Sequence, residues 1–331
     1  IIAPNVWGWL GDHLGHRMLI VRVASAVSLV VFLGMFWAES FWSIALVMTL
    51  YSFFWNASLP QFEVVTFSYL RDRVARYARI RVWGSIGFIV TVMVLGAIVE
   101  RGGPETILPS VLFIFAAILL SSLAVRDPDP EPHPVDQQSL GAILRKPAII
   151  GFFMAVFLMQ VSHGPYYAFY SIFMKEQGYS GSLIGQLWAF GVLAEVGLFV
   201  VMHHLLGRFG ARRVLIASLA LAALRWFLIG NFVDSVVLLL VAQLLHAATF
   251  CSFHAAGIHL VQHHFRGRLK GRGQALYSSV SFGAGGAVGS LVSGYAWEGL
   301  GPALTYGAAG LVALLGALVA WRWIDEHNDL A

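Results

Sequence analysis

The stretch NVWGWLGDHLGHRMLI (residues 5–20) places a polar turn, with Asp12, His16 and Arg17, between two apolar segments. Hydrophobic residues make up 58% of the 331 residues, and charged residues make up only 11%. Soluble domains carry about 25% charged residues, so this composition excludes a soluble protein. It indicates instead a series of membrane-spanning helices that are joined by polar turns, of which residues 5–20 hold the first.

The apolar segments have lengths close to the ~20 residues that a helix needs to cross a bilayer. Polar interruptions divide the chain into a short first segment, residues 1–10, and ten full spans. The ten expected spans are 18–38, 41–69, 79–100, 105–125, 148–174, 182–206, 212–231, 235–262, 273–297 and 302–324.

Basic residues are concentrated in every second loop, whereas the intervening loops are mainly acidic. Because cytoplasmic loops of membrane proteins carry the excess of Lys and Arg, we expect the basic loops and the C-terminus to be cytoplasmic. The lipid bilayer is the expected surroundings, and the net charge of +4 therefore does not indicate a nucleic-acid partner. The basic segments are 11–22, 70–81, 126–146, 208–213, 266–272 and the tail at Arg322.

The two halves of the chain repeat at an offset of 195 residues. LGDHLGHRMLI (10–20) superposes on LLGRFGARRVLI (205–216), and the basic loop at 69–81 superposes on the loop at 264–275. Parallel repeats of this kind are found in transporters. At the same offset, the second half begins at a position equivalent to about 47 residues before Ile1, so we expect the first helix and most of the second to be missing.

A polar, Pro-rich segment, RDPDPEPHPVDQQS, lies between the repeats and is predicted to be an extended linker. The expected domains are an incomplete N-terminal bundle with helices 2–6, a cytoplasmic linker, and a C-terminal bundle with helices 7–12. Their boundaries are 1–125, 126–147 and 148–331.

The segment GWLGDHLGHR resembles the signature Gly-x-Leu-x-Asp-x-x-Gly-x-Arg of the major facilitator superfamily. The segment LPQFEVVTFSYL…RYARIRVWGSIGF (59–88) resembles the phenylpropionate permease group, which is related to the lactose-permease and nucleoside-symporter groups. The resemblance implies an all-α fold of two pseudo-symmetric six-helix bundles. It also implies a monomeric transporter of the bacterial inner membrane. The matching signature residues are Gly8, Leu10, Asp12, Gly15 and Arg17.

Three ionisable residues stand out near the middle of predicted spans: Glu195, Arg225 and His246. Charged groups at this depth are costly unless they are paired or face water, so each is a candidate functional residue. Glu195 and Arg225 are expected to neutralise each other, and His has an ordinary pKa close to neutrality. The resemblance implies that the three residues couple protons and bind substrate. Thr249 and Phe250 occupy the positions one turn after His246, where a second carboxylate would be expected.

Further candidates for substrate contact lie at helical spacing. Gln243, His246 and His254 fall on one arc of a helix, and QVSHGPYYAFYSIF (160–173) begins the second half. Gly164 and Pro165 weaken the helix there. Tyr and His offer hydrogen bonds and ring stacking to an aromatic or sugar-like ligand, although ordinary helix packing would also account for them. The residues on one face of this helix are His163, Tyr166, Tyr167 and Tyr170.

Asn56, Pro60 and Glu63 share a face of the span 41–69. Asn56 is a candidate substrate residue. Glu63 is expected to pair with Arg81, either as a cytoplasmic gate or as a structural clasp.

Asp12 is expected at a helix start, where the free amides favour a carboxylate. By resemblance, it belongs to a latch between the halves on the cytoplasmic side. The other expected gating residues are Gly15, Arg17 and Arg71.

The glycines in SFGAGGAVGS (281–290) are predicted to mark close helix contacts, at Gly283, Gly286 and Gly289. They lie within a span and are not followed by the Lys-Ser/Thr of a nucleotide-binding loop. No cofactor is expected. His259 and His263 have a metal-like spacing without a completing carboxylate, so no metal site is expected either.

We therefore predict a proton-coupled symporter for a small organic solute, with an aromatic monocarboxylate such as a phenylpropionate as the expected substrate and Arg225 as the partner of its carboxylate. A sugar or nucleoside symporter and an efflux antiporter fit the same pattern. A membrane-embedded enzyme would need a convergent nucleophile or metal set, which the sequence lacks. A receptor or scaffold would gain little from buried charges.

Overall fold

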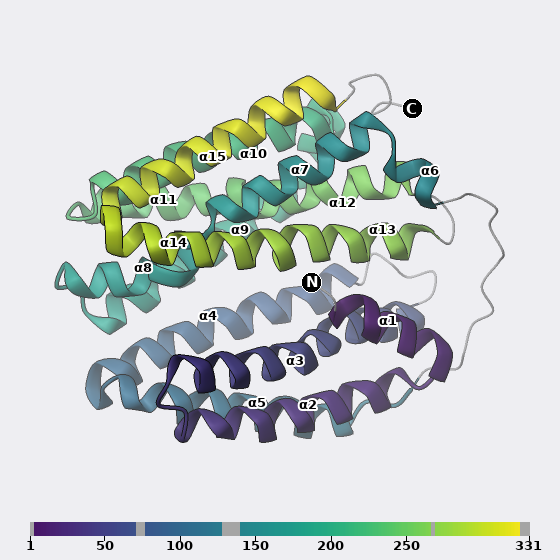
Figure 1. The fold of residues 1–331 in the computed structure, drawn as a ribbon, viewed down its shortest axis with the longest axis horizontal. Helices are drawn as coiled ribbons and strands as arrows, with labels where there is room; N and C mark the ends of the chain where they lie inside the picture. Colours follow the sequence, from purple (N-terminus) through teal and green to yellow (C-terminus); the bar gives the residue numbers. More distant parts are fainter. Residues whose placement is uncertain (1–2, 71–76, 128–139, 266–268, 325–331) are drawn as a thin grey trace. The chain divides into compact units, whose positions relative to one another are not determined.

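The computed structural model describes residues 3–70, 77–127, 140–265 and 269–324 (Figure 1). All regular secondary structure within these residues is helical. The chain divides into two compact units, which are described separately. One unit comprises Ile1–Gly84 and Ala97–His133, and the other comprises Ser85–Gly96 and Pro134–Ala331.

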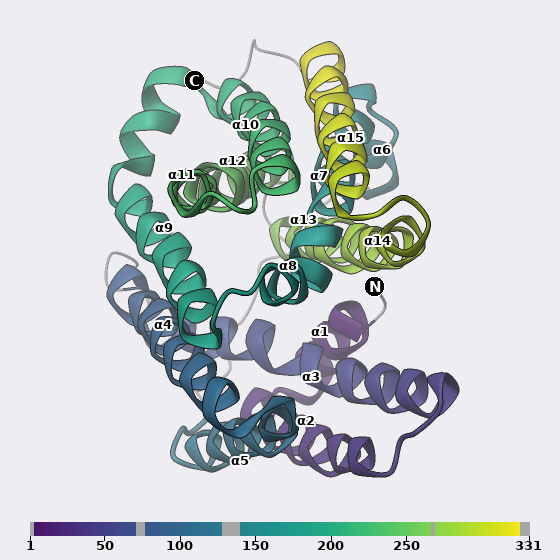
Figure 2. The same ribbon diagram turned by 90° about the vertical axis from the view of Figure 1, so that its left-hand side faces the viewer.

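The first unit is a bundle in which the second helix, α2, packs against both α3 and α5 (Figure 2). Short 3₁₀ turns follow α2 and precede α5. Helix α4 begins in this unit, and its middle segment groups with the other unit. The helices are α1 (Ala3–Leu14), α2 (Arg17–Leu33), α3 (Phe41–Leu70), α4 (Tyr77–Gly102) and α5 (Ile107–Leu123).

The turn between α1 and α2 corrects one expectation. Asp12 does not begin a helix, because it lies in the last turn of α1 and the next helix begins at Arg17. The break comes at Gly15, whose φ of 69° lies in the left-handed region that glycine adopts without a steric penalty. The helix therefore continues past Asp12 until Gly15 allows the chain to turn.

In the second unit, α15 packs along α10 and α7 (Figure 1). π-helical turns interrupt two of its long helices, at Ala248–Ser252 and Ser279–Gly285. The helices are α6 (Leu140–Leu144), α7 (Pro147–Ser162), α8 (Gly164–Glu176), α9 (Gly181–Phe209), α10 (Ala211–Asn231), α11 (Val236–Ala247), α12 (Phe253–His264), α13 (Leu269–Ser278), α14 (Gly286–Leu300) and α15 (Pro302–Trp323).

Nine helical segments of the described chain are long and apolar enough to cross a membrane. The sequence predicts ten spans, and the difference is α3. This helix has 30 residues and is not among the nine. The predicted span 148–174 is divided at His163 into α7 and α8, since Pro165 has no N–H to continue the backbone ladder.

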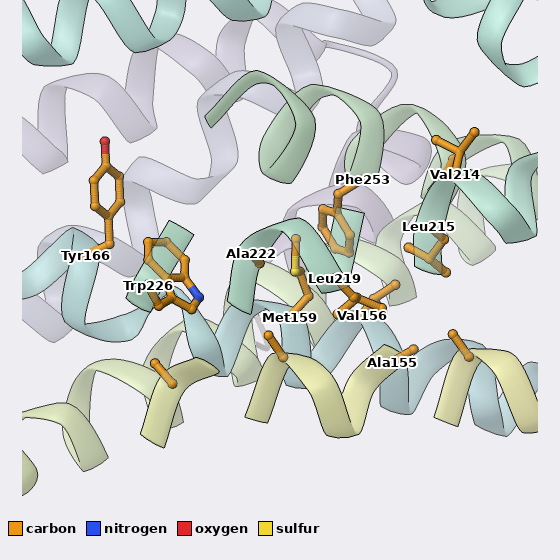
Figure 3. Packing of buried hydrophobic residues seen from close by; sticks show 14 of the residues in the cluster. Ala155, Val156, Met159, Tyr166, Val214, Leu215, Leu219, Ala222, Trp226 and Phe253 are labelled. Carbon is orange, nitrogen blue, oxygen red and sulfur yellow. The ribbon is translucent and has the colours of Figure 1, made fainter. Parts of the chain in front are cut away.

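The core of the second unit is formed mainly by α7 and α10, with contributions from α8 and α12. Figure 3 shows Tyr166 and Trp226 at one end of this cluster, beside the aliphatic residues of α7 and α10. Close van der Waals packing of these side chains holds the helices together and fixes the position of the residues at the end of the cluster. The labelled aliphatic members are Ala155, Val156, Met159, Val214, Leu215, Leu219 and Ala222.

Two glycines, one at the end of the π-helical turn Ser279–Gly285 and one in α14, allow this part of the chain to approach α7 closely. A Cβ on Gly289 would lie 2.5 Å from the Val161 carbonyl oxygen, and one on Gly285 would lie 2.7 Å from that of Phe157. No described atom of this unit lies within 4 Å of the Cβ position of Gly286, so the close contact expected there is not formed among the described residues of the unit. Residues 285 and 289 are four apart and share a helix face, whereas residue 286 is rotated by about 100°.

Candidate functional site

Arg225 of α10 is the central charged residue of the second unit. Its side chain has no exposed surface. Its Nε donates to the carbonyl oxygen of Ala242 at 2.9 Å, Nη1 donates to Thr249 Oγ1 at 3.3 Å, and Nη2 donates to Gln243 Oε1 at 3.4 Å. All three acceptors are neutral, so hydrogen bonds hold the guanidinium in place without cancelling its charge.

Aromatic rings cover the guanidinium. Its carbon lies 4.0 Å from the centre of the Tyr166 ring and 4.8 Å from that of Trp226, which is the geometry of a cation–π interaction. The hydroxyl of Tyr166 donates to Gln243 Oε1 at 3.0 Å. Trp226 Nε1 donates to Ser162 Oγ at 3.2 Å. The rings are thus fixed by their own hydrogen bonds from α11 and α7.

Glu195 of α9 faces His246 of α11, with 3.7 Å between Glu195 Oε2 and His246 Nε2. Both side chains are buried, with 8% and 6% of their surfaces exposed. The sequence predicts that Glu195 and Arg225 neutralise each other. The contact that the structure gives the carboxylate is with the imidazole of His246, and its pairing with Arg225 stays a prediction. The hydrogen bonds of Arg225 go to neutral groups of α11 and of the π-helical turn that follows it.

The four residues predicted to share one polar helix face differ in burial. His163, Tyr166 and Tyr170 are fully buried, whereas Tyr167 is 46% exposed. His163 Nδ1 lies 2.8 Å from the carbonyl oxygen of Met159 and therefore donates to it, which leaves Nε2 as an acceptor.

Four buried polar atoms around Arg225 have no hydrogen-bond partner in the described part of the chain. Buried polar groups are nearly always paired, so each such atom needs an explanation. All four lie on side chains that were predicted as site residues, and a polar ligand would satisfy them. They are His163 Nε2, Tyr170 Oη, Gln243 Nε2 and His246 Nδ1.

His254, predicted on the arc of Gln243 and His246, lies beyond the π-helical turn. Its Nδ1 is 3.3 Å from the hydroxyl of Tyr277. The ring of Phe250 stacks on the imidazoles of both His246 and His254, with centroid separations of 5.5 and 6.4 Å. The structure therefore gives His254 a separate environment.

The first unit holds the remaining candidates. Asn56 is exposed, and its Nδ2 donates to the Ser52 carbonyl oxygen of its own helix at 2.7 Å. Arg17 Nη1 donates to Gln61 Oε1 at 2.7 Å, and Gln61 Nε2 donates to the Trp7 carbonyl oxygen at 2.9 Å. This contact joins α1, α2 and α3.

Some gating candidates cannot be placed fully. Glu63 lies half-buried on α3. The side chains of Asp12 and Arg81, and all of Arg71, lie outside the described residues, as do the predicted pairs that depend on them.

Three contributing residues were not predicted: Gly191, Thr249 as a ligand of Arg225, and Gln61. A Cβ on Gly191 would lie 3.0 Å from Gln243 Oε1. The sequence could have indicated Gln61, because an amide side chain next to Pro60 within an apolar segment is unusual. Gly191 has no such signal, because its role depends on the neighbouring helix. Across the described residues, no group of three His, Cys, Asp or Glu side chains lies close enough to hold a metal ion.

Comparisons with known proteins show the family and the fold of the chain. Residues 1–308 match the MFS_1 like family. The chain is 29% identical over 324 residues to the probable 3-phenylpropionic acid transporter of Escherichia coli (strain K12), with 93% of this chain and 84% of that protein covered. It is 24% identical over 330 residues to the maltose permease of Geobacillus stearothermophilus, with 96% and 80% covered. The crystal structure of the nucleoside transporter NupG has a TM-score of 0.74 at 17% identity, with 98% of this chain and 86% of that chain covered.

Proposed function

The chain belongs to the MFS_1 like family of major facilitator transporters, and from this premise we propose that it is a proton-coupled symporter of an aromatic monocarboxylate. The superfamily and the all-helical fold predicted from residues 8–17 are confirmed. In the proposed cycle, one substrate anion and protons cross the bacterial inner membrane by alternating access. A compound of the 3-phenylpropionate class is the proposed substrate.

The observation that carries the proposal is the environment of Arg225. A buried guanidinium that touches aromatic rings and neutral oxygens keeps its full positive charge in surroundings where a charge is costly. A substrate carboxylate would compensate this charge with charge-assisted hydrogen bonds. The rings of Tyr166 and Trp226 beside it would contact the apolar ring of an aromatic acid. The relative whose name contains 3-phenylpropionic acid supports this class.

The pair of Glu195 and His246 supports the proton-coupling part of the proposal. Both groups accept a proton at physiological pH in suitable surroundings, and they lie 3.7 Å apart on neighbouring helices. The ring of His246 is 6.0 Å from that of Tyr166, which covers Arg225. A change of charge at Arg225 when substrate binds would thus change the proton affinity of the pair.

We also propose that the turn with Asp12, Gly15 and Arg17, together with Arg71, acts in gating, and that Glu63 and Arg81 form a cytoplasmic contact. The hydrogen bond from Arg17 to Gln61 supports a fixed orientation of this turn. The C-terminus is proposed to be cytoplasmic, the transporter to be monomeric, and residues 126–147 to link the two bundles.

The test is transport by the purified protein in liposomes under an inward proton gradient. We expect gradient-driven accumulation of labelled 3-phenylpropionate, and no accumulation when an ionophore removes the gradient. Accumulation of maltose or xanthosine in its place would move the substrate to the sugar or nucleoside class. Accumulation only under an outward gradient would indicate an antiporter. If no solute accumulates under either gradient, the transporter proposal is wrong and a receptor or scaffold remains.

A further inference from the structure

Gln243 places one amide oxygen between two hydrogen-bond donors. Its Oε1 accepts from the hydroxyl of Tyr166 at 3.0 Å and from Nη2 of Arg225 at 3.4 Å. The guanidinium has donors only, so the amide must present its oxygen to this side. Its Nε2 is buried without a hydrogen-bond partner among the described residues.

In this arrangement the amide oxygen accepts two hydrogen bonds, whereas the amide nitrogen donates none among the described residues. A fully buried amide that satisfies one end and leaves the other unpaired carries a cost that well-packed proteins usually avoid. The oxygen faces a phenol hydroxyl and a guanidinium N–H, which together form the donor set that a carboxylate oxygen requires. The amide oxygen is thus the neutral equivalent of an anionic group.

We propose that Gln243 Oε1 occupies the position of one carboxylate oxygen of the substrate, and that the amide moves away when the anion binds to Arg225 and Tyr166. This inference rests on the proposed function, since it assumes a carboxylate substrate at Arg225. The 3.4 Å hydrogen bond to the neutral amide is long, and a carboxylate makes shorter and stronger ones. Movement of the amide also gives its unpaired Nε2 the opportunity to find an acceptor.

Gly191 of α9 provides the space for the amide. A Cβ at this position would lie 3.0 Å from Gln243 Oε1, 3.4 Å from His246 Cδ2 and 3.5 Å from His246 Cβ. The first distance is shorter than an ordinary van der Waals contact, whereas the other two are ordinary. An added methyl group would therefore press on the amide oxygen more than on the imidazole. Gly191 is a positioning residue that acts through Gln243.

Two substitutions of Gln243 distinguish this role from simple packing. Gln243→Met keeps a side chain of similar length and removes the competing oxygen, so we expect the Kd for 3-phenylpropionate to fall, by roughly threefold. Gln243→Glu places a permanent carboxylate on Arg225, so we expect the Kd to rise, by roughly tenfold or more. Isothermal titration calorimetry on the purified protein in detergent measures both, with thermal unfolding as the check of folding.

Gly191→Ala provides an independent variant, with Gly197→Ala as its control on the same helix. Nothing lies within 4 Å of a Cβ on Gly197. We expect Gly191→Ala to change the Kd in the direction of Gln243→Met, and Gly197→Ala to leave it unchanged.

Opposite shifts for Gln243→Met and Gln243→Glu support the proposal. If the wild-type protein binds 3-phenylpropionate and both Gln243 variants bind it more weakly, or both bind it equally well, Gln243 has a packing role and the proposal is wrong while the proposed function stands. A wild-type protein that binds maltose or xanthosine but not 3-phenylpropionate overturns the proposed substrate, and this inference with it.

Discussion

The guanidinium of Arg225 lies against the face of the Tyr166 ring, with 4.0 Å between the guanidinium carbon and the ring centre. The two residues come from α10 and α8, and neither side chain is exposed. The ring stabilises the buried charge through its quadrupole without neutralising it. The charge and the ring therefore make separable contributions, which the first two predictions test.

Replacement of Arg225 tests the charge. Arg225→Lys keeps the charge but loses the planar set of donors and the stacking, so we expect the Kd for 3-phenylpropionate to rise by roughly tenfold. Arg225→Leu removes the charge as well, and we expect a rise of roughly a hundredfold. Calorimetry on the purified variants measures both, and Arg322→Lys at the exposed end of α15 is the matched control. If the wild-type protein and the three variants bind with equal affinity, Arg225 does not contact the substrate.

Replacement of Tyr166 separates the ring from its hydroxyl. Tyr166→Phe keeps the ring under the guanidinium and removes the hydroxyl, which donates to Gln243 in this structure and to the substrate carboxylate in the proposed complex, so we expect a moderate loss of affinity. Tyr166→Leu removes the cation–π contact, which contributes about 2 kcal/mol when desolvated, so we expect a larger loss of thermal stability and of affinity. Tyr295→Phe on α14, at a residue that is 75% exposed, should have no effect. A larger loss for Tyr166→Phe than for Tyr166→Leu contradicts the role given to the ring.

Replacement of Glu195 tests proton coupling. Glu195→Gln keeps the shape of the side chain and its contact with His246, but it cannot bind and release a proton. We expect accumulation of 3-phenylpropionate against its gradient to be lost, while counterflow without a proton gradient continues in part. Glu176→Gln, at the exposed end of α8, is the control and should transport normally. Wild-type accumulation by Glu195→Gln would show that another group carries the proton.

Replacement of Gly164 tests the helix crossing that positions Tyr166. A Cβ on Gly164 would meet the backbone of Gly289 on α14 well inside contact distance. Helix backbones do not yield as flexible side chains do, so we expect Gly164→Ala to lower the free energy of unfolding by roughly 1–3 kcal/mol. A thermal melt in detergent measures this. Gly294→Ala on α14, where a Cβ meets no described atom within 4 Å, should melt at or slightly above the temperature of the wild-type protein.

Replacement of Gly15 tests the turn between α1 and α2. Its φ of 69° is left-handed, so Gly15→Ala should destabilise the fold by roughly 1–2 kcal/mol. Gly8→Ala, within α1 and with no atom within 4 Å of its Cβ, should instead stabilise the helix by up to about 1 kcal/mol. Thermal unfolding compares the two variants. Equal effects of both substitutions would contradict the conformational role of Gly15.

Hydropathy and loop charge were sufficient to predict nearly all of the helices. The predicted span 182–206 is α9, and 212–231 is α10, with ends that differ by at most a few residues. These features are local, since a run of apolar residues and a glycine or polar turn are readable without knowledge of any neighbour. Interruptions within a span are harder to predict from the sequence. Pro165 indicates the break at His163, but no comparable residue indicates the π-helical turn at Ala248–Ser252.

The sequence by itself determined that this protein is a helical membrane protein. It also identified Glu195, Arg225 and His246 as candidate site residues, because an ionisable residue inside an apolar span can be recognised without knowledge of the fold. Only the tertiary structure decided their partners. Which neighbour Glu195 faces depends on the rotation of α9, α10 and α11 about their axes, and the lack of a side chain at Gly191 allows α9 to lie close to Gln243 of α11. Hydropathy reports the depth of a residue in the bilayer, whereas the pairing of charges depends on which helix faces are in contact.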